Sequence, residues 1–171
     1  MMLELGPQLP PLTATLAAIP SGREGVRATL RLMAGLTREG KKALSVRLAA
    51  LQIVENLPQR DWPAEVAALH AFVRDRIRYV KDIRGVETLQ QAERTLQLKQ
   101  GDCDDKAVLL ASLLQAIGHP ARFHAIGFKP GNYSHVYVDT LLGGKWVALE
   151  TTEPWPPGRA PDAPVHMVLT V

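Results

Sequence analysis

The sequence contains a single cysteine, Cys103, at a position where a thiol can react. It follows Gly101-Asp102 and opens an apolar segment for which we predict a buried helix over residues 102–117. The free N–H groups and partial positive charge of a helix N-terminus stabilise a thiolate and can hold the oxyanion of a tetrahedral intermediate. One thiol excludes an internal disulfide and any zinc site that needs two cysteines of this chain. Cys103 is therefore the sole candidate for a thiol nucleophile.

Acidic residues next to this cysteine oppose its ionisation. Asp104 and Asp105 in the first turn favour the helix, but their negative charges disfavour a neighbouring thiolate. A reactive Cys103 therefore needs a general base beside it. The alternative is a small buried core residue, since free cysteines are often buried. The position at a helix start, among aspartates, argues against that alternative.

Histidine is the expected base, and it needs a carboxylate to orient it. We favour His135, because it opens a strand predicted over 134–141 and because Glu150 lies on the next predicted strand, 145–151. The other histidines after the cysteine are His119, His124 and His166.

The hairpin loop between these two strands decides whether His135 and Glu150 meet. A loop of Leu142-Gly143 places them directly opposite one another, and a loop of Gly143-Gly144 places them diagonally on one face. A three-residue loop would place them on opposite faces. Asp139 shares the face of His135 and is the reserve candidate for the acid.

The elements around these residues predict an α+β fold, in which helices precede an antiparallel sheet. A third helix begins after the N-cap Asp61 and carries an apolar stripe from Trp62 to Val80. His70 lies next to this stripe and is interpreted as a structural histidine. The other predicted elements are helices at 24–34 and 39–57, a loop and short helix within 82–100, and strands at 121–128, 134–141, 145–151 and 165–171.

The motifs together resemble the transglutaminase-like superfamily. GDCDDKAVLLASLLQAIGHPARF matches its Gly-Asp-Cys helix start and long apolar helix, and SHVYVDTLLGGKWVALETT matches its His-led strand and Trp-Val-x-Leu-acid strand. The upstream VRDRIRYVKDIRGVETLQ resembles the region before the nucleophile, so the resemblance extends over residues 62–152. The overall form is most similar to small members found in bacterial phage and prophage gene sets.

This resemblance implies a papain-like fold, with the nucleophile helix packed on a sheet that carries the histidine and the acid. It assigns Cys103 as nucleophile, His135 as base and Glu150 as acid, although the family usually has an aspartate at this last position. The implied enzyme is a cysteine protease or amidase, or a transglutaminase, that acts through a thioester on a protein or peptide amide without metal or cofactor. Hydrolysis is preferred to cross-linking. The alternative is an inactive scaffold, or a phage-assembly or interaction protein, and the Glu150 substitution favours it.

Length and composition predict one globular domain. The chain has 171 residues, of which 46% are hydrophobic and 22% charged. We expect a Pro-rich arm over 1–22 and a single domain over 23–171, divided into a helical part, 23–100, and the nucleophile helix with the sheet, 101–171.

The net charge, the aromatic content and the length of the apolar segments argue against nucleic-acid and membrane partners. The net charge is +3 and 5% of residues are aromatic, which is little for binding phosphates and stacking on bases. No segment reaches the roughly 18 to 20 apolar residues of a membrane span. The N-terminus lacks an early cationic stretch and is interrupted by prolines, so we expect a cytoplasmic protein with a reduced thiol. The sequence leaves the oligomeric state open.

Overall fold

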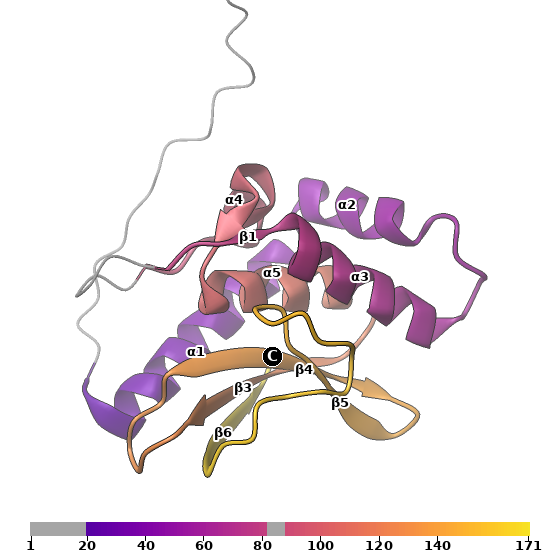
Figure 1. Ribbon diagram of the computed structural model, residues 1–171. Helices are drawn as coiled ribbons and strands as arrows, with labels where there is room; N and C mark the ends of the chain where they lie inside the picture. Colours follow the sequence, from indigo (N-terminus) through magenta and orange to yellow (C-terminus); the bar gives the residue numbers. More distant parts are fainter. Residues whose placement is uncertain (1–19, 82–87) are drawn as a thin grey trace, which may run out of the picture.

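The computed structural model of the chain describes residues 20–81 and 88–171. The predicted Pro-rich arm falls almost wholly outside these residues, and so does the segment 82–87 of the predicted loop. In the described part, helices cover one face of a four-stranded sheet (Figure 1). The predicted α+β class is confirmed.

The sheet is antiparallel and has the strand order β5-β4-β3-β6. The predicted meander forms its first three strands, and the last apolar run returns to the edge beside β3, as expected. Leu142 pairs with Lys145, so Gly143-Gly144 is the loop of the β4–β5 hairpin. Both glycines have positive φ angles, as a tight two-residue hairpin turn requires. The strands are β3 (Ala121–Gly127), β4 (His135–Leu142), β5 (Lys145–Leu149) and β6 (Val165–Thr170).

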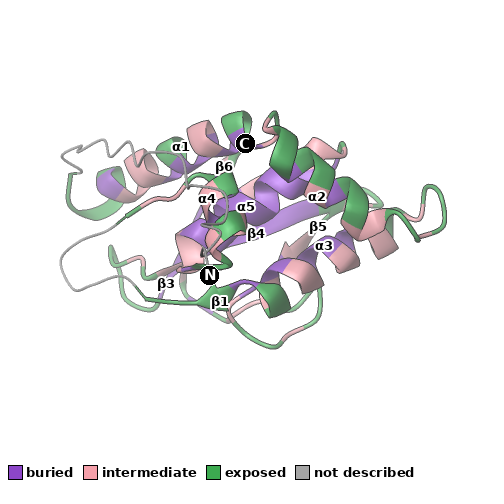
Figure 2. Cartoon of the chain, turned by 90° about the horizontal axis from the view of Figure 1, so that it is seen from above, coloured by how far each residue is buried: buried purple, intermediate pink, exposed green. Residues whose placement is uncertain are grey.

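Helix α5 (Cys103–Ala116) lies at the centre of the fold (Figure 2). Leu109, Leu110 and Leu113 are fully buried, because the sheet covers one side of the helix and the other helices cover the rest. The prediction of a helix that is apolar on nearly all sides is thereby confirmed. Its N-terminus meets the sheet where β4 begins, which brings the single cysteine close to the strand of His135.

The first two helices differ from their predicted bounds. Helix α1 (Gly22–Gly40) runs through Gly35, where we expected a break, and α2 (Leu44–Val54) is shorter than predicted. A glycine inside a helix costs about 1 kcal/mol, and packing of the flanking turns on the core outweighs that cost. Gly40 has a packing role, because a Cβ there would lie 2.6 Å from Ser112 Oγ of α5.

Helix α3 (Trp62–Arg76) begins as predicted. The Asp61 side chain accepts a hydrogen bond from the Ala64 N–H, and Val66, Leu69 and Val73 are buried on the predicted stripe. The ends of that stripe were predicted wrongly. Trp62 and Val80 are exposed, because the first turn projects beyond the core and the chain becomes extended after Arg76.

Two short parallel strands precede α5. They were not predicted from the sequence. They are β1 (Arg78–Tyr79) and β2 (Gln100–Gly101), with α4 (Ala92–Leu98) between them. Over residues 20–81 and 88–171, no helix combines the length and apolarity needed to cross a membrane.

Candidate active site

Two aspartates fix Cys103 as the first residue of α5. Asp102 Oδ1 accepts from the Asp105 N–H at 3.0 Å, and Asp105 Oδ2 accepts from the Asp102 N–H at 3.3 Å, which forms a reciprocal capping box. A Cβ at Gly101 would lie 2.5 Å from Asp105 Cβ, so a glycine is required there. The local sequence therefore places the thiol at the helix terminus.

Asp105 also ties this turn to the segment before α4. Its carboxylate accepts from the backbone N–H of Gln90 at 2.8 Å and from Gln90 Nε2 at 2.6 Å. Asp105 is buried, so these hydrogen bonds compensate the loss of water around its charge. The Asp105 carboxylate thus has a structural role, because it joins the start of α5 to the segment before α4.

The thiol itself contacts Asp104 and the start of β4. Cys103 Sγ donates to Asp104 Oδ1 at 3.5 Å and receives a backbone hydrogen bond from Val136. Burial raises the pKa of the Cys103 thiol well above its usual value, and the charges of Asp104 and Asp102 raise it further. The contact with Val136 lowers the pKa but does not outweigh burial. Ionisation of this thiol therefore requires a base, as the sequence suggested.

The histidine that precedes Val136 is paired with the predicted acid. His135 Nε2 lies 2.5 Å from Glu150 Oε2. The Gly143-Gly144 loop sets Glu150 diagonally across from His135, one residue beyond the end of β5. His135 is partly exposed, whereas Glu150 is fully buried. The structure thus pairs His135 with Glu150 and places the Cys103 thiol against Val136, the residue next to His135.

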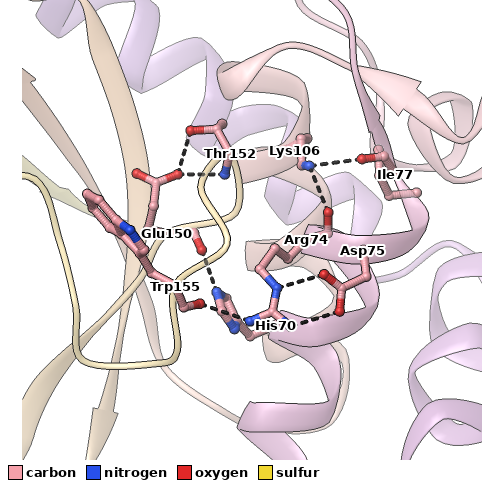
Figure 3. A network of polar contacts seen from close by, with 8 residues as sticks. All are labelled: His70, Arg74, Asp75, Ile77, Lys106, Glu150, Thr152 and Trp155. Atoms are coloured by element: carbon pink, nitrogen blue, oxygen red, sulfur yellow. Dashed lines mark hydrogen bonds and ion pairs between the residues drawn. The ribbon is translucent and has the colours of Figure 1, made fainter.

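The second oxygen of Glu150 is occupied as well. Glu150 Oε1 accepts from the Thr152 N–H at 2.6 Å and from Thr152 Oγ1 at 2.8 Å (Figure 3). Burial by itself would raise the pKa of Glu150, but the hydrogen bonds from His135 and Thr152 outweigh it and hold the pKa below its usual value. The group is an ionised acceptor at neutral pH.

An ionised Glu150 determines the tautomer of His135. A carboxylate only accepts hydrogen bonds, so His135 Nε2 must carry the proton that lies between them. In the neutral ring, Nδ1 then has a free lone pair. His135 can accept a proton at Nδ1 while Glu150 stabilises the resulting imidazolium.

His70 positions Glu150 through its main chain. This residue of α3 is fully buried, and His70 Nε2 lies 2.5 Å from the Glu150 carbonyl oxygen (Figure 3). Burial lowers the pKa of His70, so the ring is neutral and its Nε2–H donates. The sequence predicts a structural histidine here, but its partner is 80 residues away and no local pattern indicates it.

Two cationic side chains of the helices donate hydrogen bonds to main-chain carbonyls near Glu150. Arg74 Nη1 donates to the Trp155 carbonyl at 2.9 Å, which anchors the segment after β5 to α3. Lys106 Nζ donates to the carbonyls of Ile77 at 2.9 Å and Arg74 at 3.3 Å, at the C-terminal end of α3 (Figure 3). Burial lowers the pKa of Lys106 to about 8. No local sequence pattern indicates either set of contacts.

The remaining candidates lie elsewhere. Asp139, the reserve acid, accepts from Arg122 Nε at 2.8 Å and lies 3.1 Å from His124 Nδ1. His119 is buried and its Nε2 lies 2.8 Å from Glu65 Oε2. In the part of the chain that the structure describes, no group of three or more His, Cys, Asp or Glu residues is arranged to hold a metal ion.

An α+β fold with a cysteine at a helix start and a His–Glu pair on the adjoining sheet defines a thiol-containing site of papain-like arrangement. The model of the transglutaminase-like superfamily matches residues 49–151, which is more than half of the chain. The chain belongs to the transglutaminase-like superfamily. No curated protein matches it.

Two solved structures have a similar fold. One is a "putative cysteine protease" from Cytophaga hutchinsonii, with a TM-score of 0.54 and 20% identity over 73% of this chain and 46% of the other. The second is a "putative protease" from Parabacteroides distasonis, with a TM-score of 0.60 and 16% identity over 85% of this chain and 32% of the other. The chain thus spans less than half the length of either structure. At these identities the likeness shows the fold.

Proposed function

We propose that the chain is a cysteine-dependent enzyme that transfers the acyl group of a protein or peptide amide through a thioester. Cys103 is the nucleophile, His135 the general base and Glu150 the acid that orients it. The observation that carries this proposal is the 2.5 Å contact between His135 Nε2 and Glu150 Oε2, next to the strand residue that contacts the thiol. Membership of the superfamily and the cysteine-protease description of one structural neighbour support it.

In the first half-reaction, His135 Nδ1 takes the proton of the Cys103 thiol as Sγ attacks the amide carbonyl carbon. The carbonyl π electrons move to oxygen, and the backbone N–H of Cys103, which has no acceptor within the helix, stabilises the oxyanion. The oxyanion then collapses, the C–N bond breaks, and the imidazolium gives its proton to the departing amine. The product is a thioester on Cys103.

The second half-reaction releases the acyl group. His135 takes a proton from water or from an amine, which attacks the thioester carbonyl, and Cys103 leaves as a thiolate that is reprotonated from the imidazolium. Water gives hydrolysis and an amine gives cross-linking. We favour hydrolysis, because water is always present at a partly exposed histidine.

An inactive scaffold, such as a phage-assembly or interaction protein, is the second candidate. One observation favours it: burial and the contact with Asp104 raise the pKa of the Cys103 thiol. In this alternative the thiol remains protonated and the His135–Glu150 pair merely stabilises the sheet.

Alkylation of Cys103 with iodoacetamide distinguishes the two candidates, because the chain has one thiol. The enzyme predicts alkylation that is fast below pH 8 and slows at least tenfold in His135→Ala and in Glu150→Gln. The matched control is His166→Ala, which alters an exposed histidine on β6. Alkylation at the rate of a peptide thiol, or more slowly, with no response to His135→Ala, would contradict the enzyme proposal.

A trapping experiment distinguishes hydrolysis from amine transfer. The chain is incubated with a glutamine-containing peptide, with and without hydroxylamine, and the products are identified by mass spectrometry. New peptide termini indicate cleavage, and a hydroxamate formed at glutamine indicates transamidation. Cys103→Ala must abolish both products.

A further inference from the structure

A groove lies between α1 and the edge strand β6. It has a volume of about 360 Å³ and is lined by three arginines of α1 and by the β6 residues from His166 to Leu169. Helix α1 and strand β6 contact one another and lie side by side in the view from above (Figure 2). The mechanism proposed above does not use this groove.

The three arginines form a regular cationic row. Arg23, Arg27 and Arg31 follow one another at four-residue steps, so they lie on one face of α1 about 6 Å apart along its axis. Within residues 20–81 and 88–171, no carboxylate forms an ion pair with any of them, and no acidic residue lines the groove. The three arginines therefore give the groove a positive charge.

Strand β6 supplies the second half of the groove. It pairs with β3 on one side and is the last strand of the four-stranded sheet. The outer side of an edge strand presents main-chain N–H and C=O groups that can pair with another extended chain. Residues of both faces of β6, such as His166 and Met167, line the groove, so the groove lies along this edge.

We propose that this groove binds an extended acidic peptide, which adds to β6 as a fifth strand. Alternate residues of a strand point to the same side and are about 6.7 Å apart, close to the roughly 6 Å spacing of the arginines. Carboxylates at three alternate positions of such a peptide can therefore each meet one arginine of α1. Main-chain pairing with β6 gives the peptide its direction, and the arginine row selects its charge.

Two other occupants fit the groove less well. A nucleic acid meets the arginines through phosphates but has no partner for the strand edge of β6. A second copy of the chain, joined edge to edge through β6 about a two-fold axis, would bring the two arginine rows towards each other. Repulsion between them disfavours that dimer.

The proposal is tested with two seven-residue peptides that carry fluorescein, one with glutamate at the second, fourth and sixth positions and one with glutamine there. Anisotropy is measured with the Cys103→Ala protein, so that no turnover occurs and failure of the proposed catalysis does not affect the result. We expect the glutamate peptide to bind more tightly, and its affinity to fall about two- to fivefold in each of Arg27→Gln and Arg31→Gln. The exposed Arg38→Gln, on the last turn of α1, is the matched control.

Four further measurements decide between the occupants. N-methylation of the peptide main chain should weaken binding at least tenfold, and backbone amide NMR shifts on binding should concentrate on β6 (Val165–Thr170). Equal binding of the two peptides, or tighter binding of oligo(dT), would overturn the proposal. So would Arg27→Gln and Arg31→Gln variants that associate with themselves while no peptide binds, since the arginines would then only protect the sheet edge.

Discussion

The aspartates around Cys103 have separable effects, although the sequence presents them as one acidic cluster. Asp102 and Asp105 exchange hydrogen bonds within the first turn of α5, so they stabilise the helix start. Asp104 instead contacts Cys103 Sγ. Its charge, with that of Asp102, adds to burial in raising the pKa of the thiol. Burial and the charge of Asp104 therefore both favour the protonated thiol.

Replacing Asp104 by asparagine removes a negative charge beside the thiol and keeps the size of the side chain. We expect the pKa of Cys103 to fall, and alkylation by iodoacetamide at pH 8 to become about three- to tenfold faster. The exposed Asp162→Asn is the matched control. The role of Asp104 is refuted if both variants react at the wild-type rate.

Much of the site at this scale is predictable from the sequence. The two-residue periodicity of strands, combined with a two-residue glycine loop, is enough to place Glu150 on the face of His135. The contact of His70 with the Glu150 carbonyl is not predictable in this way, because it depends on how α3 packs against the segment that follows β5. Local patterns carry no information about such long-range contacts.

At the scale of elements, Lys106 joins α5 to the end of α3. Its side chain is almost completely buried, and its ammonium group donates to two carbonyls at the C-terminus of α3. These hydrogen bonds and the negative end of the helix dipole stabilise the cation. Burial opposes its charge, and the pKa of Lys106 falls to about 8 from the usual 10.5.

This pKa predicts a pH dependence of stability. Between pH 8 and 10.5 the unfolded chain binds a proton at Lys106 that the native chain has lost, so the free energy of unfolding rises with pH. From pH 8 to 9, urea titrations should show a rise about 1 kcal/mol larger in the wild type than in Lys106→Met. Lys145→Met, at an exposed lysine of β5, should keep the wild-type slope. Equal slopes in all three proteins would show that Lys106 does not titrate there.

Some local sequence signals set the boundaries of the helices, whereas others are overridden by packing in the core. Asp61 and the capping box of α5 start their helices at the predicted residues, because capping is a contact between neighbours in the sequence. Gly35 does not end α1, because the burial of Met33 and Ala34 on one side and Thr37 on the other stabilises the continuous helix. The β1–β2 pair has two residues in each strand, too few for a periodic pattern.

At the scale of the whole molecule, the residues that match the family model are fewer than the residues that form the hydrophobic core. The match begins at residue 49 and ends at 151, so it includes neither α1 nor β6. Yet Leu30 and Met33 of α1 are buried in the same core as α5. Lys41 Nζ, just after α1, donates to Gln115 Oε1 of α5 at 3.0 Å. We infer that α1 completes the core of the domain.

Removal of residues 1–43 is therefore expected to abolish cooperative folding. Burial of Leu30 and Met33 contributes about 2 kcal/mol each, and the deletion also exposes the side of α5 that α1 covers. This loss is a large part of the roughly 5–15 kcal/mol that stabilises a typical domain. Urea unfolding followed by tryptophan fluorescence should show a broad transition with a reduced m value in the deletion variant. The matched control is a chain that lacks only residues 1–19 and keeps α1. If residues 44–171 unfold as sharply as the control and at the same urea concentration, α1 is an attachment to the core and not a part of it.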